Sequence, residues 1–270
     1  MTKENLDAVY PNLIEETPEI KVIGSVPDDA VKILKAVAIS QIGAVHSHFA
    51  GHGMKSLQQL VPVTIKVFLF GNDSYRSPQN AHFVNNLNTW RHNYISRTAE
   101  GSGLLVNAAV LLELPGSYHV VVDHEIRHLY VDQVVGREVL ASSFPLREGC
   151  MGLCIDSTER LKAILERGDD GLYLPLSITN WDRQLDKEEH TRRCFIDNPW
   201  YLSMFSFFHD FIGIKRDGLA RLIQVFPTVA ALCGNLELAW KKTYSDRPTL
   251  KSLQEEWVAE EGLSRFRINE

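Results

Sequence analysis

The sequence predicts an α+β fold, in which an N-terminal α/β lobe with a small sheet precedes a lobe made of helices. Two observations lead to this prediction. The first half of the chain alternates helical periodicity with short β-branched and aromatic runs. From residue 142 onwards, apolar side chains recur almost only at helical intervals. A chain of 270 residues can bury one large core or two modest ones, so two lobes fit its length.

The first lobe is expected over residues 21–140, after an irregular arm over residues 1–20 that holds two prolines and four glutamates. Some of its segments carry apolar residues at helical spacing, and others are β-branched, aromatic or aliphatic runs that are typical of strands. We therefore expect helices over residues 28–50 and 81–94, and strands over residues 61–70 and 103–114.

A further helix is expected over residues 118–135. Ser117 can cap its first turn, and Gly136 stands where a helix commonly ends. One apolar stripe runs along this segment and predicts a buried face, formed by Val122, Ile126 and Leu129.

The second lobe is expected over residues 141–270. Its periodicity predicts helices over residues 145–155, 157–167, 198–213, 217–225, 234–243 and 249–260. Between the second and third of these lies a stretch rich in turn residues, 167–184, which is long enough to be a functional loop.

The sequence HEIRH at residues 124–128 is the strongest chemical signal in the chain. On a helix, His124 and His128 lie on the same face, four residues apart, where both imidazoles can reach one zinc ion. Glu125 lies about 100° round the helix from His124, where its carboxylate can take a proton from a metal-bound water. This is the chemistry of the H-E-x-x-H pattern. The alternative interpretation is a surface helix whose polar residues happen to share this spacing.

A catalytic zinc site needs three protein ligands and an open position, and Glu148 is the candidate for the third. Nineteen residues separate it from His128, enough for the chain to turn and return. The helical pattern after Pro145 places Glu148 in the first turn of the next expected helix.

HEIRH, followed by FPLREG at residues 144–149, resembles the gluzincin metallopeptidases, whose pattern is HExxH and then a Glu-Gly pair after a gap of this size. Residues 198–226 and 236–259 are similar to that family's aromatic helix and its closing helices. The peptidase-MA-like branch, which is compact and lacks large extra domains, is the closest fit, and the resemblance covers about residues 60–260. Arg147 is a departure, because the family more often has Ser, Asn or Thr at that position.

The resemblance implies a zincin-like fold and a zinc peptidase, with Zn2+ bound by His124, His128 and Glu148 and with Glu125 as general base. It also points to Tyr201 as the donor that stabilises the oxyanion. His190 is the rival donor, and the alternative for Tyr201 is a core tyrosine with its hydroxyl at the rim. The implied substrate is a peptide, which gluzincins pair with an edge strand, here expected over residues 103–114.

Three smaller signals carry alternatives of their own. Asp132 could accept the free ring N–H of a ligand histidine, or be an ordinary surface aspartate. His46, His48 and His52 lie close together but have no carboxylate or cysteine beside them, so a second metal site there is the weaker interpretation. Cys150 and Cys154 are more typical of small buried thiols than of metal ligands.

The composition argues against several classes of protein. A net charge of −6 with interspersed charges disfavours a nucleic-acid partner, which would need a basic patch. The N-terminus has no signal-peptide pattern, and the longest apolar run, residues 103–114, is too short to span a bilayer. We therefore expect a cytoplasmic protein without membrane insertion, although secretion without a cleaved signal stays open.

The function predicted from the sequence is a zinc-dependent peptidase. The alternative from another class is a catalytically inactive zinc-binding or regulatory module with the same fold. The two differ in whether Glu125 is needed for activity.

Overall fold

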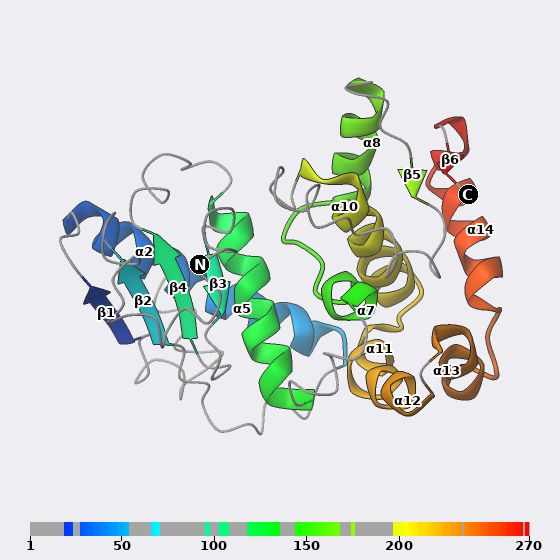
Figure 1. Cartoon of the computed structure of the whole chain (residues 1–270), viewed down its shortest axis with the longest axis horizontal. Coiled ribbons are helices and arrows are strands. Elements are labelled where there is room, and N and C mark those ends of the chain that lie inside the picture. The colour runs from blue at the N-terminus through cyan, green and yellow to red at the C-terminus, as the bar shows by residue number, and fades with distance from the viewer. Residues whose placement is uncertain are drawn as a thin grey trace. The chain divides into compact units, whose positions relative to one another are not determined.

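The computed structural model describes residues 19–23, 28–53, 66–70, 95–97, 103–107, 118–135, 144–167, 174–175, 197–233, 235–266 and 268–269. The chain divides into two compact units, Met1–Val134 and Val135–Glu270. Each unit has its own set of elements (Figure 1).

In the first unit, four short strands form a sheet in the order β1-β2-β4-β3. They are β1 (Glu19–Ile23), β2 (Lys66–Phe70), β4 (Gly103–Asn107) and β3 (Ile95–Arg97). The first three run parallel, with Glu19 opposite Lys66 and Lys66 opposite Gly103, while β3 runs antiparallel to β4 with Ile95 opposite Val106. The expectation that the 103–114 segment supplies an edge strand is wrong for the described sheet, because β4 pairs on both sides.

The helices described in this unit are α2 (Asp28–Gly51) and α5 (Tyr118–Val135). The predicted bounds of the second helix, 118–135, are confirmed. Two aspartates in the first turn of α2 suit the positive end of its helix dipole. The Arg127 guanidinium lies over the Phe49 ring, 5.9 Å from its centroid, and so links α5 to the last turns of α2.

The fold class predicted from the sequence is wrong for the residues whose side chains the structure describes. Those residues are 80 % helical and include no strand residue. The strands are backbone ladders of five residues or fewer, so the predicted runs over 61–70 and 103–114 form strands only over 66–70 and 103–107. A β-branched or aliphatic run indicates extended backbone, but it does not determine how many of its residues pair with a neighbouring strand. The buried side chains that the structure describes lie mainly on helical segments.

Other expectations fall partly or wholly outside the described residues. The helix expected over 81–94 lies outside them, as does most of the arm over 1–20, whose last two residues begin β1. Within the loop expected over 167–184, Leu174 and Pro175 form a two-residue strand, β5, that pairs in parallel with β6 (Ile268–Asn269).

The second unit is described mainly as helices. They are α7 (Phe144–Gly149), α8 (Ser157–Arg167), α10 (Pro199–Phe205), the π-helix η7 (Ser206–Lys215), α11 (Leu219–Gln224), α12 (Phe226–Cys233), α13 (Leu236–Thr243), α14 (Leu250–Glu260) and the 3-10 turn η8 (Leu263–Arg265).

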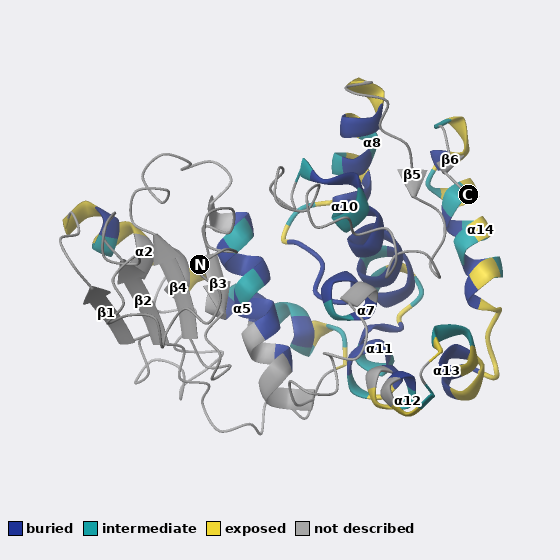
Figure 2. Cartoon of the chain, viewed as in Figure 1, coloured by how far each residue is buried: buried dark blue, intermediate teal, exposed yellow. Residues whose placement is uncertain are grey.

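The largest fully buried side chains of this unit are aromatic. Figure 2 shows buried residues, in dark blue, along α10 and at points on α14. Phe207 packs against Phe208, Phe211 and Trp257, with ring centroids 5.1–6.4 Å apart. A second cluster joins α12 to α13, where Trp240 stacks on Tyr244 at 4.0 Å. The apolar side chains along the helix expected over 198–213 are buried, since Met204, Phe205, Phe208 and Ile212 are 0–1 % exposed.

Side-chain caps explain where several of these helices begin. Asn198 accepts a hydrogen bond from the Trp200 amide at 3.0 Å, with Pro199 in the first helical position. Asn235 and Thr249 cap α13 and α14 in the same way.

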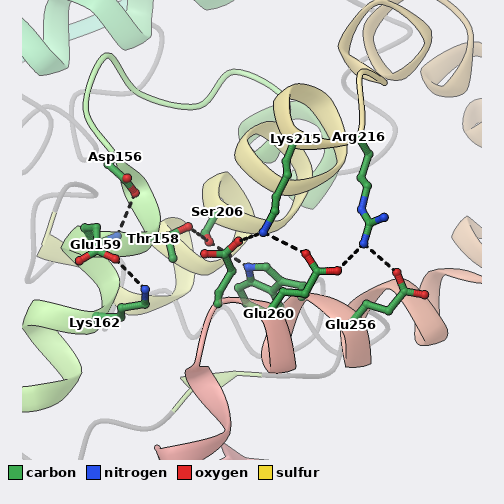
Figure 3. A network of polar contacts seen from close by, with 11 residues as sticks. Asp156, Thr158, Glu159, Lys162, Ser206, Lys215, Arg216, Glu256 and Glu260 are labelled. Atoms are coloured by element: carbon green, nitrogen blue, oxygen red, sulfur yellow. Dashed lines mark hydrogen bonds and ion pairs between the residues drawn. The ribbon is translucent and has the colours of Figure 1, made fainter.

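The helix expected over 198–213 changes from α-helix to π-helix at Ser206. The Ser206 hydroxyl accepts a hydrogen bond from Trp257 Nε1 at 3.0 Å and shares another with Thr158 Oγ1 at 2.5 Å (Figure 3). Further along, Lys215 and Arg216 pair with glutamates of α14, among them Glu260. These contacts hold η7 against both α8 and α14.

Candidate metal centre

Helix α5 brings the two histidines of HEIRH together. Their Nε2 atoms lie 3.0 Å apart, and the rings are nearly perpendicular with centroids 4.6 Å apart. Both residues are buried, each 1 % exposed. The helix alone produces this pairing, because residues four apart share a face.

The spacing of His124 and His128 suits a divalent cation. Between two neutral imidazoles this contact requires one Nε2 to carry a proton and donate it to the other. A metal ion would take the place of that proton, and nitrogens 3.0 Å apart can both lie about 2.0–2.1 Å from one zinc ion.

Glu125, between the two histidines in sequence, is only half-buried, whereas both of its neighbours on α5 are fully buried. A carboxylate with this exposure is partly open to solvent. The position agrees with what a general base needs, although its role stays a prediction.

A buried ion pair adjoins the histidines in the sequence of α5, because Asp123 directly precedes His124 and Arg127 directly precedes His128. Arg127 Nε donates to Asp123 Oδ2 at 2.7 Å, and the two side chains are 4 % and 0 % exposed. The other carboxylate oxygen, Oδ1 of Asp123, is buried and has no hydrogen-bond partner among the residues that the structure describes. This pair was not predicted from the sequence, although an aspartate four residues before an arginine is a recognisable helical pairing.

Glu148 lies at the end of helix α7, not in its first turn as the sequence suggested. The helix begins at Phe144 and ends at Gly149, where the chain turns. Gly149 packs closely against α10 and η7: a Cβ there would lie 2.6 Å from Phe208 Cδ2 and 3.1 Å from the Met204 carbonyl oxygen. Only glycine permits this approach, so close packing explains why a glycine follows Glu148.

The turn after Glu148 contains a second glycine with a packing role. Gly152 has a φ of +61°, and a Cβ there would collide with the ring of His209 at 2.2 Å. The expected helix over 145–155 therefore stops at Gly149, because the chain must turn sharply against η7.

Glu148 itself is 6 % exposed. Its Oε1 accepts hydrogen bonds from Arg147, whose Nε and Nη2 both lie 3.0 Å away. A buried carboxylate is costly without a compensating charge, and this guanidinium supplies one.

Among the residues that the structure describes, one group of three histidine, cysteine or carboxylate side chains could hold a metal ion: His124, His128 and Glu148. Each offers one ligand atom, and these atoms all lie within 4.8 Å of one another. All three residues are buried. This is the set predicted from the sequence, and two imidazoles with one carboxylate are a donor set that zinc accepts.

The other residues predicted for the site are Tyr201, His190 and Asp132. Tyr201 lies in the first turn of α10, half-buried, with its ring 6.0 Å from that of Phe205. His190, and the side chain of Asp132, lie outside what the structure describes.

The two weaker metal sites gain no support. His48 and His52 have ring centroids 5.0 Å apart, but no third ligand joins them among the described residues. Cys150 is buried, and burial raises the pKa of its thiol, so it stays protonated at neutral pH. Cys154 is exposed.

A histidine that the sequence analysis overlooked lies in the π-helix. The His209 side chain is 3 % exposed and its Nδ1 donates to Asp210 Oδ1 at 2.6 Å. Asp210 also accepts from the Ser157 amide at 3.2 Å, at the start of α8. The only sequence signal for this pair is that His209 is directly followed by Asp210. This pair secures η7 against α8 and the turn at Gly152.

No family model matches the chain, and no match was found among curated proteins or solved structures. The resemblance to gluzincins therefore rests on the sequence motifs alone. In the described part of the chain, none of the helices has the length and apolar character needed to cross a membrane.

Proposed function

We propose that this chain is a zinc-dependent hydrolase of peptide bonds. His124, His128 and Glu148 would hold the ion, and Glu125 would act as general base. The observation that carries the proposal is the buried two-histidine, one-carboxylate group whose ligand atoms lie within 4.8 Å of one another.

The choice of zinc follows from the donor types. Imidazole nitrogen with a single carboxylate is a common ligand set for zinc, whereas calcium and magnesium favour sites made of oxygen ligands. The burial of all three residues also suits an ion held by protein rather than by water.

A bound zinc ion would supply a Lewis acid and lower the pKa of a coordinated water towards about 7. Glu125 would accept the proton of that water and later deliver it to the leaving amine. The partial exposure of Glu125, beside the buried His124, supports its assignment as the base. Tyr201 is the proposed donor to the oxyanion, with His190 as the alternative.

Substitution of Glu125 tests the chemistry separately from the metal. Glu125→Gln keeps the size of the side chain and removes the base, so zinc content should stay near one ion per chain while cleavage of a peptide library falls at least about a hundredfold. The matched control is Glu159→Gln on α8, an exposed glutamate paired with Lys162, which should change neither quantity.

Metal analysis of the purified protein tests the site itself. His128→Ala should lose zinc together with activity. A protein that binds zinc, has Glu125 intact and cleaves no peptide would instead support the inactive zinc-binding module. A protein that takes up no divalent metal would refute both.

A further inference from the structure

Arg147 differs from the other arginines described in the second unit because its carboxylate partner is a candidate metal ligand. Two of its nitrogens, Nε and Nη2, lie 3.0 Å from the same oxygen, Glu148 Oε1. The Arg147 side chain is 31 % exposed and that of Glu148 is 8 % exposed. The guanidinium therefore reaches inward from the surface to a buried carboxylate.

This contact places a fixed positive charge beside a carboxylate that is a candidate metal ligand. The guanidinium stays protonated at any physiological pH. A divalent ion that takes Glu148 as a ligand must share the carboxylate with it, and the two positive charges repel one another. An ion held through both carboxylate oxygens would have to displace Arg147 from Oε1.

We propose that Arg147 is a built-in competitor for Glu148 that sets the metal selectivity of the site. This inference rests on the proposed metal centre. Arg147 pairs with the carboxylate of Glu148, and an ion that favours nitrogen ligands draws more of its affinity from His124 and His128. Ions that depend on oxygen ligands, such as Mn2+, lose more when the carboxylate is shared. The arginine thus favours zinc at the cost of absolute affinity.

Two effects of removing Arg147 oppose each other. The guanidinium orients Glu148, and losing such a partner commonly weakens metal binding. The guanidinium also offsets the negative charge of Glu148, so its removal should strengthen the binding of a metal cation. We expect the charge to dominate, because Glu148 lies on a helix whose end is already fixed by the close packing of Gly149 on Phe208.

The test measures Zn2+ and Mn2+ affinity by competition with a chromogenic chelator, in the full-length protein and in Arg147→Gln. The variant should bind Zn2+ about tenfold and Mn2+ about a hundredfold more tightly, so that the preference for zinc falls roughly tenfold. Arg147→Met is the second variant, used if the first does not fold, and the same shifts are expected. The Co2+ absorption spectrum should also change, because a freed carboxylate can bind through both oxygens.

Arg160→Gln is the matched control. Arg160 also pairs with a carboxylate, Asp197, at a similar exposure of 36 %, but Asp197 belongs to no candidate metal group. Its removal should leave both affinities unchanged. Unaltered or weakened zinc binding in the Arg147 variants, with the same zinc preference, would overturn the inference while leaving the metal centre intact. Failure of the unmodified protein to bind zinc would overturn the proposed function itself.

Discussion

Helix α5 and helix α7 each carry part of the proposed metal centre, but different physical causes place their side chains. On α5, the helical repeat alone brings His124 and His128 to an Nε2–Nε2 distance of 3.0 Å. On α7, the position of Glu148 depends on the close approach of Gly149 to Phe208 and on the turn at Gly152. The comparison teaches that a local repeat can be read from a sequence, whereas a packing contact with a distant segment cannot.

The two helices also stabilise their buried charges differently. α5 contains a fully buried ion pair between Asp123 and Arg127, at 0 % and 4 % side-chain exposure. α7 ends in a pair that is open to solvent on one side, between Arg147 and Glu148. Removing one partner should therefore cost more on α5.

Asp123→Ala should have the largest effect on the free energy of unfolding, a loss of about 3–5 kcal/mol, because it leaves the buried Arg127 cation without its carboxylate. Denaturant unfolding at neutral pH measures this. The control is Asp197→Ala, whose pair with Arg160 is about half exposed and should cost less than about 1 kcal/mol. Equal losses in the two variants would mean that burial of the α5 pair has no special importance.

Gly149→Ala should have the next largest effect. The added Cβ would meet Phe208 Cδ2 at 2.6 Å and the Met204 carbonyl at 3.1 Å, so the backbone has to move, at about 1–3 kcal/mol. Zinc affinity should fall as well, because Glu148 moves with its neighbour. Thermal unfolding and chelator competition check the two outcomes.

The matched control for Gly149 lies on the other unit. Gly51 ends helix α2, and a Cβ there would meet nothing within 4 Å. Gly51→Ala should therefore be neutral or stabilise by up to about 1 kcal/mol, through the higher helix propensity of alanine. A loss of stability at Gly51 as large as that at Gly149 would contradict the packing explanation.

These contacts also show which features the sequence could predict. The bounds of α5 and α8 agree with the predicted helices 118–135 and 157–167. The segment of α5 lies between a capping serine and Gly136, and that of α8 has a clear helical periodicity. The helix expected over 145–155 ends at Gly149, and the one expected over 198–213 becomes a π-helix at Ser206, because tertiary contacts override periodicity in both. The pairing of Arg147 with Glu148 could likewise not be predicted from the sequence, because it depends on the direction of both side chains.

The smallest effect should come from the exposed charges that join η7 to α14. Hydrogen bonds from Lys215 lower the pKa of Glu260, and the same cluster, first Glu261 and then Glu260, raises the pKa of Lys215. The stability contributed by Glu260 is present above its unfolded pKa and is lost as pH falls through its lower folded pKa. The contribution of Lys215 is complete below its unfolded pKa and is lost as pH rises through its raised folded pKa.

Between these limits the cluster should give a flat stability profile. Lys215→Met should therefore reduce the free energy of unfolding by a small, constant amount between about pH 5 and pH 9 and by less at about pH 3, where the carboxylates are protonated. About 1 M salt should shrink the difference as well, because exposed ion pairs are screened. Asp123→Ala should keep most of its effect at that salt concentration, since a buried pair is poorly screened. If salt weakened both variants' effects equally, the distinction between the buried pair of α5 and the exposed charges of the second unit would fail.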